Sequence, residues 1–536
     1  MVESTFEAAG TLVGVDAAGR ISRVASSARP GTSLLSLGHP HVRVTHPPEP
    51  APVQREPAQM EPVQLELARL AIDADEVEST LVAAGALEIT VRHMFVAGWQ
   101  TRFVLSNPAT RPITLGVTWP WLVDPGAVGW AVADGAEAAL FVQPHDGAGP
   151  ILVGRLRQGA VVRFDEQGLA LPEIVLDPGG RYVLGWDWDW LTEPSAYGRR
   201  WATLHPTVTT LVRGEVVLLP AGPDVALVVP DGIAVERDDE LCALTAAEPR
   251  TAAVELRSAR GLHVVRLTWT PTATELLAAV AGKLLAAPRG RTGVVRLPGL
   301  DAAVVVQHAL RAEAVDAPDD AQDALDQFTA RFEPDVLDPA GPDAAFGALF
   351  LAGEFERTGE PELLDRAAAQ VLRATRPAPG LGVAATRVCA GLIVAGASPQ
   401  AVMDHLIALA GRPAADAEPD DPLDRLALSV LTRHLHAADH QDDALVRAVL
   451  ALGTELGSGL PGDPVRPWPA ERLGRLLATF ATLPDGVAEP TRRAWGVPAA
   501  DLAARRTPTL IARLVGEPLG RGHRWLAVLA SAGGPQ

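Results

Sequence analysis

The sequence has little lysine, cysteine or tyrosine. Lys283 is its single lysine, and its 536 residues include 2 Cys and 2 Tyr. With 46 Lys and Arg against 65 Asp and Glu, the formal net charge is −19. An acidic chain without basic clusters binds phosphate backbones poorly, so we expect no nucleic-acid partner. Cys242 and Cys389 cannot supply four zinc ligands. We expect two buried free thiols, and a disulfide between them stays an alternative.

Long apolar runs are also missing. No segment reaches the roughly 20 uncharged apolar residues of a membrane span, and the start MVESTFEAAG lacks the pattern of a secretory signal. We therefore expect a cytoplasmic protein with no membrane partner. The sequence has no P-loop, no G-x-G-x-x-G after an expected strand and no G-x-S-x-G. Nucleotide-dependent and serine-hydrolase chemistry are therefore unsupported, and we expect no cofactor.

Short alternating segments fill the first half of the chain. Residues 87–92 and 113–119 alternate apolar and polar side chains with period two, as in strands that bury one face. Turn signals such as Asn107-Pro108 and Asp177-Pro178-Gly179-Gly180 separate these runs. Strands without intervening helices predict antiparallel sheets packed as a sandwich. We assign residues 1–272 to this β-sandwich, with a further division near 204–214.

Ala- and Leu-rich segments replace the alternating pattern after about residue 302. Breaks near Gly359, Gly396, His440 and Pro484 lie about 40 residues apart, the length of one helical hairpin with its connection. We therefore expect a linker over 273–301 and an α/α helical-hairpin domain over 302–536. The fold class is α+β multidomain, with an N-terminal antiparallel β-sandwich and a C-terminal α/α-hairpin toroid. The helical part is short for six full hairpins, which favours a truncated or irregular toroid.

The clearest hairpin reads LFLAGEFERTGEPELLDRAAAQVLR over residues 349–373. It resembles the hairpins of (α/α) toroid proteins, and a sandwich followed by a toroid resembles the six-hairpin glycosidase superfamily. The resemblance implies a carbohydrate-active protein, an inverting glycoside hydrolase that acts at the junction of sandwich and toroid. Lanthionine-cyclase-like and terpene-cyclase-like toroids share the motif. A toroid-type lyase or cyclase is therefore one alternative, and a non-catalytic scaffold or binding protein is another.

The run Gly185-Trp-Asp-Trp-Asp-Trp190 is the most unusual in the chain. In a strand it places Trp186, Trp188 and Trp190 on one face and Asp187 and Asp189 on the other. Indole rings stack on sugar rings and carboxylates accept hydrogen bonds from hydroxyl groups, so these five residues are candidate glycan-binding residues. The alternative is that the tryptophans belong to the sandwich core and the aspartates face solvent.

Glu354 and Glu356 are the candidate catalytic carboxylates, because they end the first helix of the hairpin. An inverting glycosidase needs an acid and a base on opposite sides of the scissile bond. Two positions apart on a helix, the two glutamates point to different faces, so only one of them can line a cavity. The alternative is that both are solvated carboxylates near a helix end.

Histidines cluster weakly at two places. His434, His436, Asp439 and His440 suggest a metal site, but the Glu of an H-E-x-x-H motif is missing and the dipole of a helix C-terminus favours histidine by itself. His39, His41 and His46 lie in a Pro-rich stretch. We therefore assign no metal.

Overall fold

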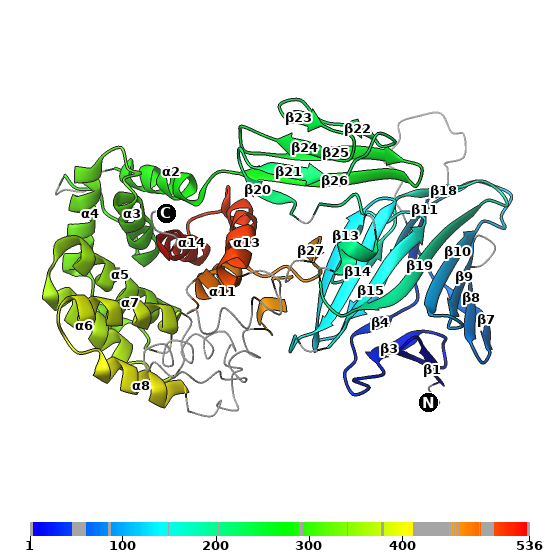
Figure 1. Ribbon diagram of the computed structural model, residues 1–536, viewed down its shortest axis with the longest axis horizontal. Coiled ribbons are helices and arrows are strands. Elements are labelled where there is room, and N and C mark those ends of the chain that lie inside the picture. The colour runs from blue at the N-terminus through cyan, green and yellow to red at the C-terminus, as the bar shows by residue number, and fades with distance from the viewer. Residues whose placement is uncertain are drawn as a thin grey trace.

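The computed structural model describes residues 4–45, 61–83, 87–147, 149–194, 196–201, 203–206, 208–288, 293–339, 341–376, 380–410, 450, 452–454, 456–457, 460–481, 483, 492 and 498–532. Antiparallel sheets form the N-terminal part, and helices form the C-terminal part (Figure 1). This arrangement confirms the predicted fold class of a β-sandwich followed by a helical region.

The first sandwich packs one large sheet against two smaller ones. The nine-stranded sheet has the order β27 (Asp463–Pro464), β13 (Ala127–Asp134), β14 (Glu137–Pro144), β15 (Ile151–Gln158), β19 (Arg181–Leu191), β10 (Trp99–Ser106), β9 (Leu87–Met94), β8 (Glu76–Ala83) and β7 (Glu66–Ile72). The five-stranded sheet has the order β1 (Ser4–Ala8), β2 (Thr11–Val15), β3 (Ile21–Ser26), β4 (Leu35–Leu37) and β12 (Trp121–Val123). The six-stranded sheet has the order β16 (Arg163–Asp165), β17 (Gly168–Ala170), β11 (Ile113–Trp119), β5 (His41–Thr45) and β6 (Glu61–Val63), and β18 (Ile174–Leu176) pairs with β11. One apolar core joins all three sheets.

Turn chemistry connects the strands as the sequence predicts. Asn107 follows β10, and its side-chain amide donates to the carbonyl groups of Arg111, Leu176 and Asp177. The same residue therefore fixes its own turn and holds the second predicted reversal, at Asp177–Gly180, beside it. An asparagine side chain suits this position because it satisfies backbone carbonyl groups that strands leave unpaired.

A second, smaller sandwich follows the first. Its four-stranded sheet has the order β20 (Thr210–Val212), β26 (Gly261–Thr270), β25 (Arg250–Ser258) and β22 (Ala226–Val228), and its three-stranded sheet consists of β21 (Val216–Leu219), β24 (Cys242–Thr245) and β23 (Ala234–Arg237). It has an apolar core of its own, which includes Cys242 and Trp269. The short helix α1 (Ala196–Arg200) precedes it in the chain.

The helical region consists of α2 (Ala273–Leu285), α3 (Leu300–Arg311), α4 (Pro318–Arg331), the 3₁₀ turn η1 (Pro334–Val336), α5 (Pro342–Thr358), α6 (Pro361–Leu372), α7 (Leu381–Val394), α8 (Gln400–Ala410), α11 (Ala470–Ala481), α13 (Ala499–Leu514) and α14 (Arg521–Ala532). The α5–α6 hairpin matches its sequence signals, because Gly359 ends α5 with a φ of 77° and Pro361 opens α6. Gly341 occupies the N-cap of α5, and Asp343 lies in its first turn.

The segment 273–301, expected as a linker, contains a helix. Thr272 and Glu275 form a capping box at the start of α2, a signal that a search for hairpin spacing overlooks. Leu277 and Ala281 of α2 are buried in the core of the helical region. We therefore place α2 with the helices, and the connection to α3 is correspondingly shorter.

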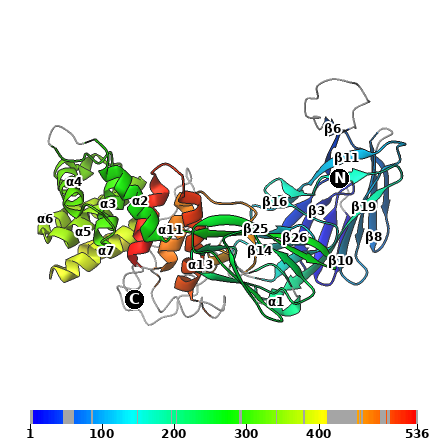
Figure 2. The same cartoon turned by 90° about the horizontal axis from the view of Figure 1, so that it is seen from above.

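The centre of the helical region is packed. Helices α11, α14, α3, α5 and α7 contact one another in that order. Phe346 of α5 meets Trp525 of α14 edge to face, with ring centroids 4.7 Å apart. Leu, Ala, Val and Phe side chains fill the rest of one continuous core. Figure 2 shows this region beside the sandwiches along the long axis of the molecule.

Both cysteines are buried and unpaired, as expected. Burial raises the pKa of the Cys389 thiol to about 11. Over the described part of the chain, none of the helices combines the length and the apolar character that crossing a bilayer requires.

We predict that Trp188→Ala destabilises the first sandwich by about 3–5 kcal/mol, because the indole is 5% exposed and removing it leaves a cavity. The ring stacks on Trp99 with centroids 4.3 Å apart. Guanidinium unfolding followed by near-ultraviolet circular dichroism measures the change. Val175→Ala is the control, because this side chain of the same sandwich is 64% exposed and its loss should cost less than about 0.5 kcal/mol. Equal effects of both substitutions would contradict the assignment of Trp188 to the core.

Candidate functional site

The tryptophans of β19 lie mainly inside the first sandwich. Trp186 and Trp188 are 1% and 5% exposed, and both pack in its core. Trp190 is half-buried, and its indole N–H donates to Thr11 Oγ1 over 2.7 Å. Two buried rings cannot stack on a sugar. This placement matches the alternative left open by the sequence, that the tryptophans are core residues, and it corrects the expectation of a three-ring platform.

Asp187 and Asp189 lie on the opposite face of β19, as the alternation predicts. Both are half-buried and both are paired with arginine, Asp187 with Arg157 over 3.0 Å and Asp189 with Arg200. These carboxylates therefore already have charged partners on the outer face of the nine-stranded sheet.

Glu354 is a fully buried member of a polar network. Its side chain is 0% exposed and accepts hydrogen bonds from Gln307 over 2.7 Å, from Thr329 over 3.2 Å and from Arg357 over 2.6 Å. Arg357 also pairs with Asp326. This network ties α3, α4 and α5 together. The expectation that a carboxylate at this point faces an open cavity is not met at Glu354.

Glu356 points to another face of α5, as its spacing from Glu354 predicts. Its side chain is 36% exposed and accepts two hydrogen bonds from Arg387, over 2.9 and 2.8 Å, and a further one from Arg311. Neither glutamate lines the cavities described below. The two candidate carboxylates therefore occupy separate polar networks and do not face each other across a cleft.

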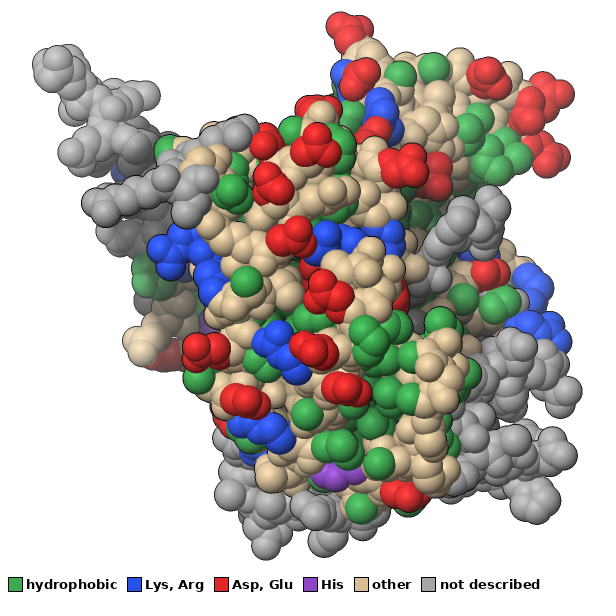
Figure 3. Space-filling model, turned by 90° about the vertical axis from the view of Figure 1, so that its left-hand side faces the viewer, with side chains coloured by type: hydrophobic (Ala, Val, Ile, Leu, Met, Phe, Trp, Pro, Cys, Tyr) green, Lys and Arg blue, Asp and Glu red, His purple; other side chains and the backbone are tan. Residues whose placement is uncertain are grey.

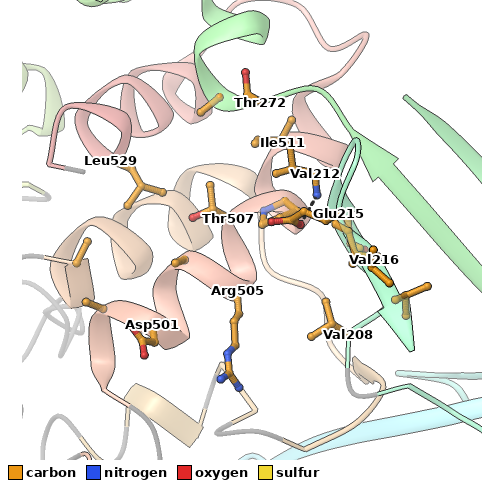
Figure 4. A pocket seen from close by; sticks show the side chains of 18 of the residues that line it. Val208, Val212, Glu215, Val216, Thr272, Asp501, Arg505, Thr507, Ile511 and Leu529 are labelled. Carbon is orange, nitrogen blue, oxygen red and sulfur yellow. Dashed lines mark hydrogen bonds between the residues drawn. The ribbon is translucent and has the colours of Figure 1, made fainter. Parts of the chain in front are cut away.

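The largest cavity described lies between the second sandwich and the helices, and we call it the junction cleft. It measures about 1080 Å³. Strands β20 and β21 form one wall and α13 forms the other, with the start of α2 and the end of α14 closing one side (Figure 4). The polar groups along it are the side chains of Thr210, Glu215, Thr272, Asp501, Arg505 and Thr507.

Two opposite charges on α13 face the junction cleft. Asp501 and Arg505 are four residues apart and therefore share a helix face. Both are exposed, and no ion pair joins either of them to another described residue. Figure 4 shows the Arg505 side chain extending away from α13, with Val208 on the opposite side of the view from Asp501. Around these charges the walls are apolar, with Val216 and Leu218 each 53% exposed. The cleft therefore offers a free guanidinium, a free carboxylate and hydroxyl groups between apolar walls.

A second cleft, of about 620 Å³, opens where α3, α5 and α14 begin. Arg524, 3% exposed at its side chain, pairs with both Asp301 and Asp343, the latter over 2.8 Å. One guanidinium thus holds two carboxylates together, and Arg331 and Arg521 add positive charge nearby. Sequence reasoning missed this group of three residues because they lie far apart along the chain. The only signal is that each lies in the first turn of a helix.

A buried histidine cluster joins the two sandwiches. His205 Nδ1 is hydrogen-bonded to Asp134 of β13, and the Leu204 N–H donates to Glu137 of β14 over 2.8 Å. His263 of β26 lies 3.9 Å from Glu137. Burial lowers the pKa of His205, but the hydrogen bond to Asp134 and the charges of Asp134, Glu137 and Asp463 outweigh it, so the pKa is raised overall.

Of the histidines singled out in the sequence, His39 and His41 are among the described residues. His434, His436, Asp439, His440 and His46 lie outside the described residues. Among the described residues, no three or more His, Cys, Asp or Glu side chains are grouped as metal ligands. His39 instead contacts the Ala18 carbonyl over 3.0 Å.

The surface at the helical end carries mixed charges. Acidic and basic side chains are interspersed there, and no broad basic patch forms among the described residues that this view shows (Figure 3). Such a surface does not provide the clustered positive charge that phosphate backbones attract.

We predict that Glu354→Ala lowers the free energy of unfolding by about 1–3 kcal/mol, because the buried Gln307 amide and the half-buried Arg357 guanidinium lose the carboxylate to which both donate. Urea unfolding followed by far-ultraviolet circular dichroism measures the loss. Asp323→Ala on α4 removes an exposed carboxylate and should change stability by less than about 0.5 kcal/mol. A fully stable Glu354→Ala protein would show that the network does not support the fold.

We also predict that His205 stabilises the protein more at acidic than at alkaline pH. Its pKa is raised in the folded state, so the stabilisation is complete below the unfolded value of about 6.5 and declines as pH rises through the folded value. The difference in melting temperature between the protein and His205→Gln should therefore shrink from about pH 5.5 to about pH 9. His41→Gln, at an exposed position, is the control. A gap that widens with pH would reverse the assigned sign.

Comparison with known proteins gives a fold likeness. No family model matches the chain, and no curated protein matches it by sequence. Among solved structures, one described as Polysaccharide Lyase BACCELL_00875 aligns with a TM-score of 0.65 at 12% identity, covering 95% of this chain and 92% of that one. An aldose 1-epimerase candidate from Escherichia coli K12 covers 35% of this chain with a TM-score of 0.23, too low to support an argument. At 12% identity, the first likeness shows that the two proteins share a fold over nearly their whole length.

Proposed function

We propose that this protein is carbohydrate-active and binds a polysaccharide in the junction cleft. The observation that carries the proposal is that two opposite charges, Asp501 and Arg505, line a cleft of about 1080 Å³ without an ion-pair partner among the described residues. Ligand sites in proteins commonly measure roughly 300–1,000 Å³, so the cleft has room for several sugar units. The end-to-end fold likeness to a polysaccharide lyase supports the same substrate class.

The chemistry of the junction cleft suits a sugar acid. A guanidinium binds a carboxylate through two parallel hydrogen bonds, which Arg505 can offer because no described carboxylate occupies it. Asp501 and the hydroxyl groups of Thr210, Thr272 and Thr507 can exchange hydrogen bonds with sugar hydroxyls. The apolar walls can cover the C–H faces of the rings. No tryptophan or tyrosine is among the described residues that line the cleft, so binding there rests on charge and hydrogen bonds more than on ring stacking.

Elimination is the reaction we favour within this proposal. The related fold belongs to a protein described as a polysaccharide lyase, and a lyase acts beside a sugar carboxylate that Arg505 could hold. Inverting hydrolysis by Glu354 and Glu356 is the finer possibility raised by the sequence. It would need carboxylates roughly 6.5–9.5 Å apart with a water between them, whereas Glu354 is fully buried. A non-catalytic binding protein of the same architecture would hold the same ligand without turnover.

We predict that Arg505→Ala weakens binding of an acidic polysaccharide by about tenfold to a hundredfold, the effect of losing one charged hydrogen-bonding group of about 1.5–3 kcal/mol. Calorimetric titration with acidic and neutral polysaccharides measures the affinity. Arg260→Ala is the matched control, because Arg260 is exposed in the turn between β25 and β26 and does not line the cleft.

Two readouts separate the possible reactions. Hydrolysis and elimination both release reducing ends, but only elimination forms a carbon–carbon double bond that absorbs ultraviolet light. Binding without either product would favour the non-catalytic alternative. Equal loss of affinity in Arg505→Ala and Arg260→Ala, or no binding of any polysaccharide in the panel, would refute the junction cleft as the site.

A further inference from the structure

A small cavity separate from the junction cleft lies among four helices. It measures about 20 Å³ and is enclosed by α3, α5, α7 and α14. Gln307, His308, Arg311, Arg387 and Ser531 provide its polar atoms, and the remaining wall is apolar. A cavity needs roughly 10–15 Å³ to hold one water molecule, so this one admits a single atom or a very small molecule.

The hydrogen bonds around His308 fix where its proton lies. Ser531 Oγ donates its hydrogen to the Ala527 carbonyl over 2.8 Å, so it can only accept from His308 Nδ1, 2.8 Å away. The proton of the neutral ring therefore sits on Nδ1, and Nε2 carries a lone pair. His308 is 7% exposed, and its Nε2 has no hydrogen-bond partner. A buried acceptor without a partner costs free energy, and the cavity is the space into which it can bond.

Positive charge exceeds negative charge beside this cavity. Arg311 of α3 and Arg387 of α7 both pair with the single carboxylate of Glu356 on α5. The facing residue on α14, Ser531, is uncharged. Burial lowers the pKa of Arg387 to about 10, and burial with the charge of Arg387 lowers that of Arg311 to about 10. Burial and the two arginines lower the pKa of His308 to about 4. Burial is the main cause of these shifts, and for Arg311 and His308 the neighbouring positive charge adds to it.

We propose that this cavity binds one small monovalent anion of the size of chloride, together with a proton taken up on Nε2 of His308. The anion supplies the negative charge that Arg311 and Arg387 lack and accepts the hydrogen bond of the new N–H. Anion and proton enter as a neutral pair, so the site gains no net charge, although Arg311 is 40% exposed and Arg387 20% exposed at the side chain. The volume of about 20 Å³ excludes a sugar ring, which separates this site from the proposed glycan site.

Thermodynamic linkage between anion and proton binding fixes the direction in which the anion affinity changes with pH. A bound anion raises the pKa of His308, so the affinity for the anion must rise as pH falls through the pKa of the bound state. In that range the dissociation constant falls by up to about tenfold for each unit decrease in pH, as one-proton coupling requires.

The test compares chloride with gluconate, an anion too large for the cavity, at equal ionic strength. The melting temperature should be higher in chloride, and the difference should be larger near pH 5 than near pH 8. Arg387→Gln should abolish the chloride effect, and His308→Gln should abolish its pH dependence. Arg373→Gln is the matched control, because Arg373 pairs with Asp335 away from this cavity.

A measurement on the unaltered protein avoids variants that fail to fold. Calorimetric titration of chloride in two buffers of different ionisation enthalpy should show proton uptake on binding. Formate, with three heavy atoms, should bind more weakly than chloride. Identical stability in chloride and gluconate at both pH values would mean that the cavity holds water, and it would overturn the proposal. Chloride binding without proton uptake would overturn the role of His308. Neither result bears on glycan binding in the junction cleft.

Discussion

The burial of both faces of β13, β14 and β15 is the constraint on which the rest of the structure depends. One face of these strands packs in the core of the first sandwich, and the other packs against α1, Leu460 and Trp468. A strand that is apolar on both sides cannot be left open to water on either. The helical region supplies the missing cover, and β27 extends the same sheet. Trp130 anchors this contact, because its N–H donates to the Thr454 carbonyl over 3.2 Å and Arg506 lies over its ring. The position of the junction cleft follows from this attachment.

The alternating strands and the hairpin could be predicted because their signals are local. Period-two burial in β9 and β11 follows directly from the sequence, and Gly359 with Pro361 marks the turn between α5 and α6. The strands β13 to β15 lack that clear alternation, since both of their faces are buried. Part of their second cover, Leu460 and Trp468, comes from residues about 300 positions further along the chain, which no short window can reveal. The α2 helix is different, because its signal is the local capping box of Thr272 and Glu275, which hairpin spacing does not include.

The candidate site could be predicted only as a location. The expectation of a site where sandwich and helices meet agrees with the position of the junction cleft, but none of the residues proposed from sequence lines it. Trp186, Trp188 and Glu354 were singled out because tryptophan and glutamate can serve sugar chemistry. Burial decides whether they are available, and burial depends on tertiary contacts. Asp501 and Arg505 carry no comparable mark in the sequence, because exposed charges four residues apart are common on helices.

Glu354 and Glu356 show how far two neighbouring carboxylates can diverge. A rotation of about 200° separates positions i and i+2 on a helix, since each residue adds about 100°. Glu354 consequently faces α3 and α4, where Gln307 and Thr329 donate to it, and Arg357 of its own helix adds a further donor. Glu356 faces α7 and the end of α3, where its carboxylate pairs with Arg387 and with Arg311. Glu354 is therefore fully paired, and its hydrogen bonds hold α3, α4 and α5 together. Glu356 is one carboxylate between two arginines, so positive charge is in excess beside the unpaired Nε2 of His308. This excess is the reason why we propose that the neighbouring cavity binds an anion.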